Sequence, residues 1–252
     1  MGKKLVLSVL CLLVLDVFYV DAEEVCSKEL SESQDKIDSC MVRTSTITLD
    51  STFLWQSRYV SMGRDQLNDG GIYSIDGGVG WNNFSAGAWF ATGDREGYEE
   101  VDFSVAYTMD MGSFCTEVGY NRLEFLSSNE SDNEFFAQID YSKIPYVTLC
   151  LYSVYATESG GSAIEPSVVS EWFVFKDRLR IEPYALVGFD FGYSTEEFDG
   201  ENNFQVGVDL FWRVTTYFDV VGSVAHSWAL EDMKREGLGD LSWGTIGLSF
   251  SY

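Results

Sequence analysis

The feature that most constrains this chain is a two-residue alternation of apolar and polar side chains, which runs from about residue 44 to residue 252. It is clearest at residues 100–111, where Val101, Phe103 and Val105 alternate with acidic, hydroxyl and small side chains. Because successive side chains of a strand point to opposite faces, this pattern predicts strands with one apolar and one polar face. At this length it predicts an all-β protein.

The connections between these segments favour a membrane barrel over a soluble sandwich. Turns after even-numbered segments are tight, as at residues 82–83 and 112–113, whereas those after odd-numbered segments are longer and charged, as at residues 194–203 and 231–240. Outer-membrane barrels have short turns at one rim, long loops at the other and an even number of strands. We therefore predict a transmembrane, up-and-down antiparallel β-barrel of about twelve strands, with ten as the alternative.

The last segment, residues 241–252, is expected to close the barrel. It places Ile246, Leu248, Phe250 and Tyr252 on one face. A closed barrel leaves no strand edge in lipid, so this strand should pair antiparallel with the first, which is expected at about residues 46–62. Phe250 and Tyr252 are the expected recognition signal for the barrel-assembly machinery, with Tyr252 as an anchor at the membrane interface.

The start of the chain predicts export. Lys3 and Lys4 precede an apolar run at residues 5–15, and small residues follow before residue 23, so residues 1–22 have the features of a signal peptide. Residues 23–43 are polar and lack alternation, which predicts a short periplasmic leader before a barrel of residues 44–252. The expected location is the cell outer membrane, where lipids surround a monomer.

The composition is strongly acidic, with 40 Asp and Glu against 16 Lys and Arg and a net charge of −24. This balance argues against nucleic acid as a partner, because binding its backbone requires Lys and Arg. Among the cysteines, Cys26 and Cys40 could form a bridge in an oxidising compartment. Cys115 and Cys150 are expected to be free thiols.

The charged face of each strand is predicted to line the lumen, because Arg or Lys facing mid-membrane lipid costs about 2–4 kcal/mol. We predict a narrow channel whose acidic wall favours small polar or cationic solutes. The alternative is a non-conducting structural or surface barrel, filled by ion pairs, whose acidic loops bind a partner. No connection between strands is expected to form a large plug. The predicted lumen-facing charges are Asp50, Arg58, Asp76, Asp102, Asp110, Glu117, Asp140, Arg180, Glu182, Asp190, Asp209 and Arg213.

Catalysis is not predicted. His226 is the one histidine, and Ser223 and Ser227 lie near it in the sequence, where a Ser–His pair could activate a nucleophile. Alternation places His226 and Ser227 on opposite faces, which argues against such a pair. The acidic run at residues 196–201 lacks the ligand spacing of an EF-hand, so neither a metal nor a cofactor is expected.

Residues 57–63, Ser-Arg-Tyr-Val-Ser-Met-Gly, lie in the expected first strand and resemble the S-x-Y-x-x-x-G stretch of uncharacterised Gram-negative outer-membrane barrels, the Gcw family. Ala88-Trp89 and Glu100-Val101-Asp102 follow in a similar order. The resemblance covers about residues 44–252. It implies a barrel with no settled biochemical role.

Overall fold

The computed structural model describes residues 47–95, 97–195 and 199–252, and the statements below concern these residues. The predicted signal peptide and leader, with Cys26 and Cys40, lie outside them. The described elements are the strands β1 (Ile47–Gln56), β2 (Val60–Ser61), β3 (Arg64–Asp65), β4 (Ile72–Trp81), β5 (Phe84–Gly93), β6 (Glu99–Asp110), β7 (Phe114–Phe125), β8 (Glu130–Ile144), β9 (Val147–Ala156), β10 (Ser162–Ser170), β11 (Trp172–Val174), β12 (Leu179–Phe191), β13 (Asp199–Arg213), β14 (Phe218–Ala229) and β15 (Leu241–Ser251), and the helix α2 (Glu231–Arg235).

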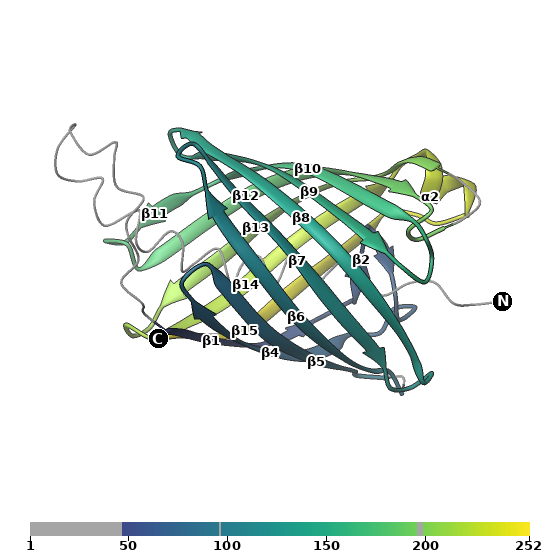
Figure 1. Ribbon diagram of the computed structural model, residues 1–252, viewed down its shortest axis with the longest axis horizontal. Helices are drawn as coiled ribbons and strands as arrows, with labels where there is room; N and C mark the ends of the chain where they lie inside the picture. The colour runs from purple at the N-terminus through teal and green to yellow at the C-terminus, as the bar shows by residue number, and fades with distance from the viewer. Residues whose placement is uncertain (1–46, 96, 196–198) are drawn as a thin grey trace.

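The wall is a single antiparallel sheet that closes on itself (Figure 1). Each wall strand pairs with the next along the chain, and β12 pairs with both β10 and β11. If β11 is counted as the continuation of β10, the wall has twelve strands. The predicted twelve-stranded all-β barrel is confirmed, and the alternative of ten strands is wrong.

The first and last strands form the predicted seam. β1 and β15 are antiparallel, with Leu54 opposite Gly247 and Asp50 opposite Ser251. The backbones of Leu49 and Tyr252 exchange two hydrogen bonds of 2.8 Å, which continues the seam past the end of β15. Every backbone group along such a seam is paired within the sheet, as a lipid environment requires.

The outer face of the wall is apolar. The side chains of Phe53, Phe103 and Leu248 are about half exposed, while the polar residues between such positions are buried. No helix among the described residues is long and apolar enough to cross a bilayer. Near the short turns, aromatic rings from adjoining segments contact one another, which is the girdle expected at a membrane interface. The pairs are Phe84–Tyr107, Phe114–Tyr141, Tyr146–Trp172, Phe175–Trp212, Tyr217–Tyr252 and Phe218–Phe250.

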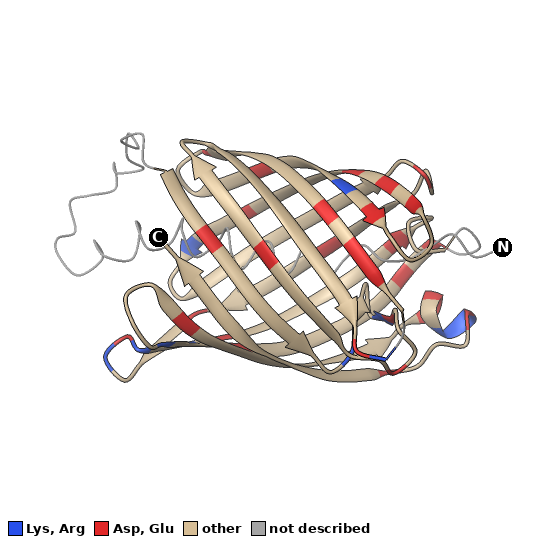
Figure 2. Ribbon diagram, turned by 90° about the horizontal axis from the view of Figure 1, so that it is seen from below, with Lys and Arg blue, Asp and Glu red and all other residues tan. Residues whose placement is uncertain are grey.

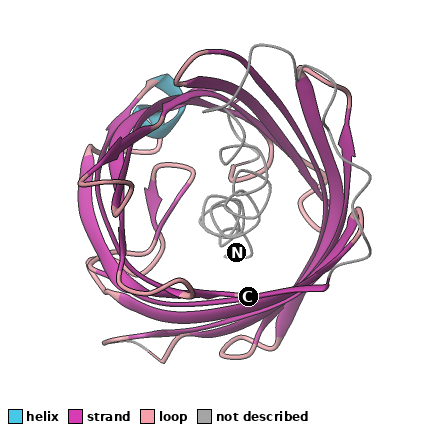
Figure 3. Ribbon diagram, turned by 90° about the vertical axis from the view of Figure 1, so that its left-hand side faces the viewer, coloured by secondary structure: helices cyan, strands magenta, loops and turns pink. Residues whose placement is uncertain are grey.

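The first strand is shorter than predicted. β1 ends at Gln56, and the chain leaves the wall before it returns as β4 at Ile72. Between them β2 and β3 pair as a small hairpin, which lies inside the ring of strands when the barrel is viewed end-on (Figure 3). Tyr59 and Val60 are both buried although they are sequence neighbours. The two-residue alternation is therefore lost here, and the prediction of a strand over residues 46–62 is wrong.

Candidate functional site

The inward face of the wall is lined with carboxyl groups. Acidic positions are distributed along the strands, whereas basic positions are few (Figure 2). The pairing of the strands places two of these acids side by side, because Glu182 on β12 lies opposite Asp209 on β13. Asp76 on β4 lies opposite Thr52 on β1. The Thr52 amide donates to Asp76 Oδ1 at 3.1 Å. The acids with buried side chains are Asp50, Asp76, Glu100, Asp102, Glu134, Asp140, Glu165, Glu182, Asp190 and Asp232.

Arg180 is a basic group on the inward face of the wall, near the short-turn end of β12. Its Nε lies 3.1 Å from Glu182 Oε1, and its Nη1 lies 3.7 Å from Glu171 Oε1. The guanidinium also lies 4.0 Å from the ring centroid of Phe211, a cation–π contact. This one guanidinium is outnumbered by three nearby carboxyl groups, those of Glu171, Glu182 and Asp209.

Three predicted lumen residues lie at or beyond the ends of wall strands. Arg58 follows β1 rather than belonging to it, and its guanidinium forms ion pairs with Asp65 and Asp69 in the connection between β1 and β4. The hydrogen bond to Asp65 raises the pKa of Arg58. Asp110 and Arg213 are exposed at the ends of β6 and β13, beside the short turns. Asp50, Asp76, Asp102, Glu117, Asp140, Arg180, Glu182, Asp190 and Asp209 all have buried or half-buried side chains on wall strands.

The most prominent feature of the lumen is the connection from residue 57 to residue 71, here named the inward hairpin. Ser61 pairs with Arg64, so the hairpin turns on Met62 and Gly63. Both have positive φ, 45° and 71°, as a two-residue turn that follows the strand twist requires. The Gln66 amide donates to the Tyr59 carbonyl at 2.8 Å, which extends the pairing toward the base.

Near its base, the inward hairpin binds the wall through Tyr59. The side chain is fully buried, and its hydroxyl lies 3.1 Å from Glu100 Oε2 on β6. Its ring also contacts Trp89 on β5 and Tyr98, which bonds the same carboxylate. Burial, reinforced by the Glu100 charge, raises the pKa of both tyrosines, so each stays protonated and donates its hydrogen bond.

At its tip, the inward hairpin packs against a different part of the wall. Met62 belongs to an apolar cluster with residues from β6 to β10. Tyr193, which follows β12, joins this cluster and also turns inward: its hydroxyl lies 2.6 Å from Glu134 Oε1 on β8. The cluster consists of Met62, Ala106, Leu123, Phe136, Tyr152, Val154, Ala156, Ala163 and Tyr193.

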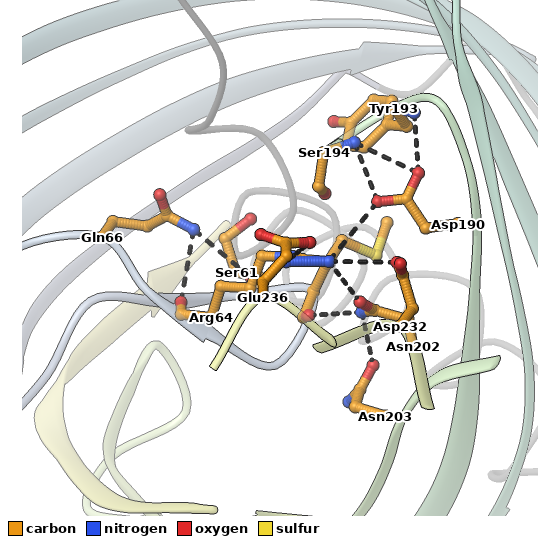
Figure 4. A network of polar contacts seen from close by, with 11 residues as sticks. Ser61, Arg64, Gln66, Asp190, Tyr193, Ser194, Asn202, Asn203, Asp232 and Glu236 are labelled. Carbon is orange, nitrogen blue, oxygen red and sulfur yellow. Dashed lines mark hydrogen bonds and ion pairs between the residues drawn. The ribbon is translucent and has the colours of Figure 1, made fainter. Parts of the chain in front are cut away.

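Arg64 connects the inward hairpin to a third part of the wall (Figure 4). Its side chain is 1% exposed. Nη2 donates to Asn202 Oδ1 at 2.8 Å and to Asp232 Oδ2 at 3.2 Å, and lies 3.8 Å from Asp190 Oδ2. Nη1 donates to Glu236 Oε1 at 2.9 Å. Asn202 lies on β13 and Asp190 at the end of β12. Asp232 lies on α2, and Glu236 follows it directly.

The inward hairpin therefore contacts the wall on several sides of the lumen. This connection is a small hairpin rather than a large plug, so the expectation that no connection between strands forms a large plug stays a prediction. The sequence contains one signal here, which is Met62-Gly63 between Ser61 and Arg64. That signal indicates a turn, but it does not indicate that the turn folds inward.

His226 is paired with Ser242, a serine that the sequence alone does not place near it. Its Nδ1 lies 2.6 Å from Ser242 Oγ on β15, directly across the strand pair, and its ring contacts Trp228. Ser227 lies on the opposite face, where its hydroxyl bonds Asn203. No carboxylate contacts His226 among the described residues, so the ring lacks the third group that orients a catalytic histidine. Among the described residues, Cys115 and Cys150 form no disulfide, as predicted.

Comparison with solved structures identifies similar barrels. The KdgM porin in complex with disordered oligogalacturonate aligns with a TM-score of 0.56 and 11% identity, over 81% of this chain and 99% of that one. The NanC porin aligns with a TM-score of 0.51 and 13% identity, over 80% of this chain and 98% of that one. The chain shares the barrel fold of these porins. No protein-family model matches it, so the resemblance to the Gcw family stays a prediction, and no curated protein matches its sequence.

Proposed function

We propose that this chain forms a narrow outer-membrane channel for the passive passage of small polar or cationic solutes. The observation that carries the proposal is the excess of acidic groups on the inward face of a closed barrel. Carboxylates in a confined, water-filled space concentrate cations and repel anions. Glu182 and Asp209, which lie opposite each other on neighbouring strands with Arg180 as their nearest basic group, are the centre of the proposed cation preference.

The charge of the lumen narrows the class of solute. The KdgM porin is described in complex with oligogalacturonate, a sugar chain that carries a carboxylate on each unit. A wall lined by acids repels such a polyanion. We infer that this barrel, although similar in fold, takes neutral or positively charged solutes instead.

The proposed setting follows from the same reasoning. Residues 1–22 would direct export, and the apolar outer face and aromatic girdle would contact outer-membrane lipids. Phe250 and Tyr252, at the end of the seam strand, would be recognised by the barrel-assembly machinery. The chain would act as a monomer, without an enzymatic activity of its own.

The second candidate is a non-conducting structural or surface barrel whose acidic loops bind a partner. The inward hairpin favours this reading, because it contacts several parts of the wall and fills part of the lumen. The two functions differ in one measurable property, which is the electrical conductance of the purified protein in a lipid bilayer.

The test is conductance in a planar bilayer under a salt gradient, where the reversal potential reports cation against anion permeability. We expect the wild-type protein to conduct and to prefer cations. The double variant Glu182→Gln/Asp209→Asn should lose much of that preference. Glu124→Gln is the control, because Glu124 follows the fully buried Leu123 and so lies on the outer face, paired with Arg122. A wild-type protein that never conducts, or an unchanged reversal potential in the double variant, would overturn the proposal.

A further inference from the structure

We propose that the inward hairpin sets the size limit for solutes at the long-loop mouth of the barrel, and that Arg64 is the positioning residue that holds it there. This inference rests on the proposed channel function and assigns its size selectivity to one element.

The attachments are spread around the lumen. The base of the hairpin is covalently joined to β1 and β4, and Tyr59 is bonded to Glu100 on β6. Met62 belongs to an apolar cluster that includes residues from β6 to β10. Arg64 is bonded to Asn202 on β13 and to Asp232 on α2. A segment with contacts to so many strands lies across the cross-section, so a solute that enters at this mouth has to pass beside it.

Arg64 suits this attachment better than any other side chain would. Its guanidinium is planar, stays charged when buried and presents several donors in fixed directions. Here these donors reach Asn202, Asp232 and Glu236 from a side chain that is 1% exposed. Asn202 also donates to the Met62 carbonyl at 2.6 Å, so one wall residue binds both the turn and the arginine. A lysine could supply the charge but not this set of bonds.

The turn fits closely against the wall. A Cβ added to Gly63 would lie 2.7 Å from Asn203 Cγ and 2.8 Å from Asn203 Cβ, closer than real side chains approach. Its φ of 71° is also costly for any residue with a side chain. Met62 adopts a positive φ of 45° as well, a strained conformation that its burial in the apolar cluster offsets. The tip is therefore docked, and releasing it should not disturb the base at Tyr59.

The experiment compares Arg64→Met with Arg122→Met. Arg122 lies on the outer face and pairs with Glu124, so its loss removes the same charge without touching the hairpin. Single-channel conductance is recorded in planar bilayers, and liposome swelling is measured with neutral sugars of increasing length. Arg64→Met should raise the conductance roughly twofold or more and admit longer sugars, because the free cross-section grows. Arg122→Met should match the wild-type protein.

Further variants separate a positioning role from a general loss of stability. Arg64→Lys should restore part of the wild-type size limit, because the charge returns without the full set of bonds. Gly63→Ala should widen the mouth without any change of charge. If Arg64→Met does not fold, as judged by heat-dependent mobility in gels, Arg64→Met/Asp232→Asn replaces it, since that pair leaves one fewer uncompensated buried acid.

Each outcome decides the inference. If wild type conducts and folded Arg64→Met and Gly63→Ala variants keep its conductance and sugar limit, the inference is wrong while the channel stands. If wild type is silent and Arg64→Met conducts, the inference holds and the passive channel does not. If folded wild-type and Arg64→Met proteins are both silent, releasing the hairpin opens nothing, and both proposals are overturned.

Discussion

Replacing Gly247 by alanine should weaken the seam that closes the barrel. A Cβ at this position would lie 2.1 Å from the Phe53 carbonyl oxygen on β1 and 2.5 Å from Leu54 Cδ2. Side chains essentially never approach other atoms within 3.0 Å, so the strands would have to separate by about 0.9 Å at this point. That displacement stretches the adjacent hydrogen bonds of the seam beyond the usual 2.7–3.2 Å range for N–H···O bonds.

The cost can be estimated from these contacts. Losing one or two hydrogen bonds costs about 0.5–1.5 kcal/mol each, and overpacking costs about 1–3 kcal/mol. We therefore expect Gly247→Ala to lower the free energy of unfolding by about 2–4 kcal/mol. Gly77→Ala, which adds a methyl group beside the other edge of β1, is the control. Its nearest atom, the Asp50 carbonyl oxygen, would lie 3.7 Å away, and an effect within about 1 kcal/mol is expected.

The assay is equilibrium unfolding in urea of the protein folded in detergent or lipid, followed by tryptophan fluorescence and heat-dependent gel mobility. A third variant, Leu54→Ala/Gly247→Ala, tests which contact causes the loss of stability, the one with the Phe53 carbonyl oxygen or the one with the Leu54 side chain. If the obstacle is the Phe53 carbonyl, shortening Leu54 restores no stability. Equal free energies of unfolding for Gly247→Ala and Gly77→Ala would refute the reasoning.

Two further predictions concern the inward hairpin. A double-mutant cycle between Arg64→Met and Asp232→Asn should give a coupling of at least about 1 kcal/mol, and the cycle with Glu236→Gln should give less, because the Glu236 side chain is 26% exposed and that of Asp232 is 1%. Equal couplings in urea unfolding would contradict this. The raised pKa of Tyr59 makes docking of the hairpin strongest below pH 10, the ordinary pKa of tyrosine, and weaker above it. Conductance should rise in alkaline buffer, and less so in Tyr59→Phe; an equal rise would count against this role.

The wall of the barrel could be predicted from the sequence because its physics is local. Each strand needs an apolar face toward lipid and tolerates polar groups toward the lumen, and that requirement repeats every second residue. The acids of the wall follow from the same rule, and Asp102, Glu182 and Asp190 are buried on strands where alternation places them. The pairing of β1 with β15 also follows, since an open edge in lipid would leave backbone groups unpaired.

The inward hairpin could not be predicted in the same way. In the sequence, the alternation typical of a wall strand continues through Tyr59, but in the structure both Tyr59 and Val60 are buried in the lumen. Because that alternation includes Arg58, the sequence predicts Arg58 in the first strand. The roles of Glu100 and Glu134 are not visible in the sequence, because their partners Tyr59 and Tyr193 belong to connections rather than to wall strands.

By itself, the sequence determined a closed, acid-lined, twelve-stranded barrel with an apolar outer face, since each of these properties depends on neighbours one or two residues away or on strands adjacent along the chain. The tertiary structure decided what lies inside. Arg64 finds its partners 138, 168 and 172 positions further along the chain, at Asn202, Asp232 and Glu236. Those residues meet only after the barrel has closed, because closure brings β13 and α2 to the place where the connection after β1 can reach them.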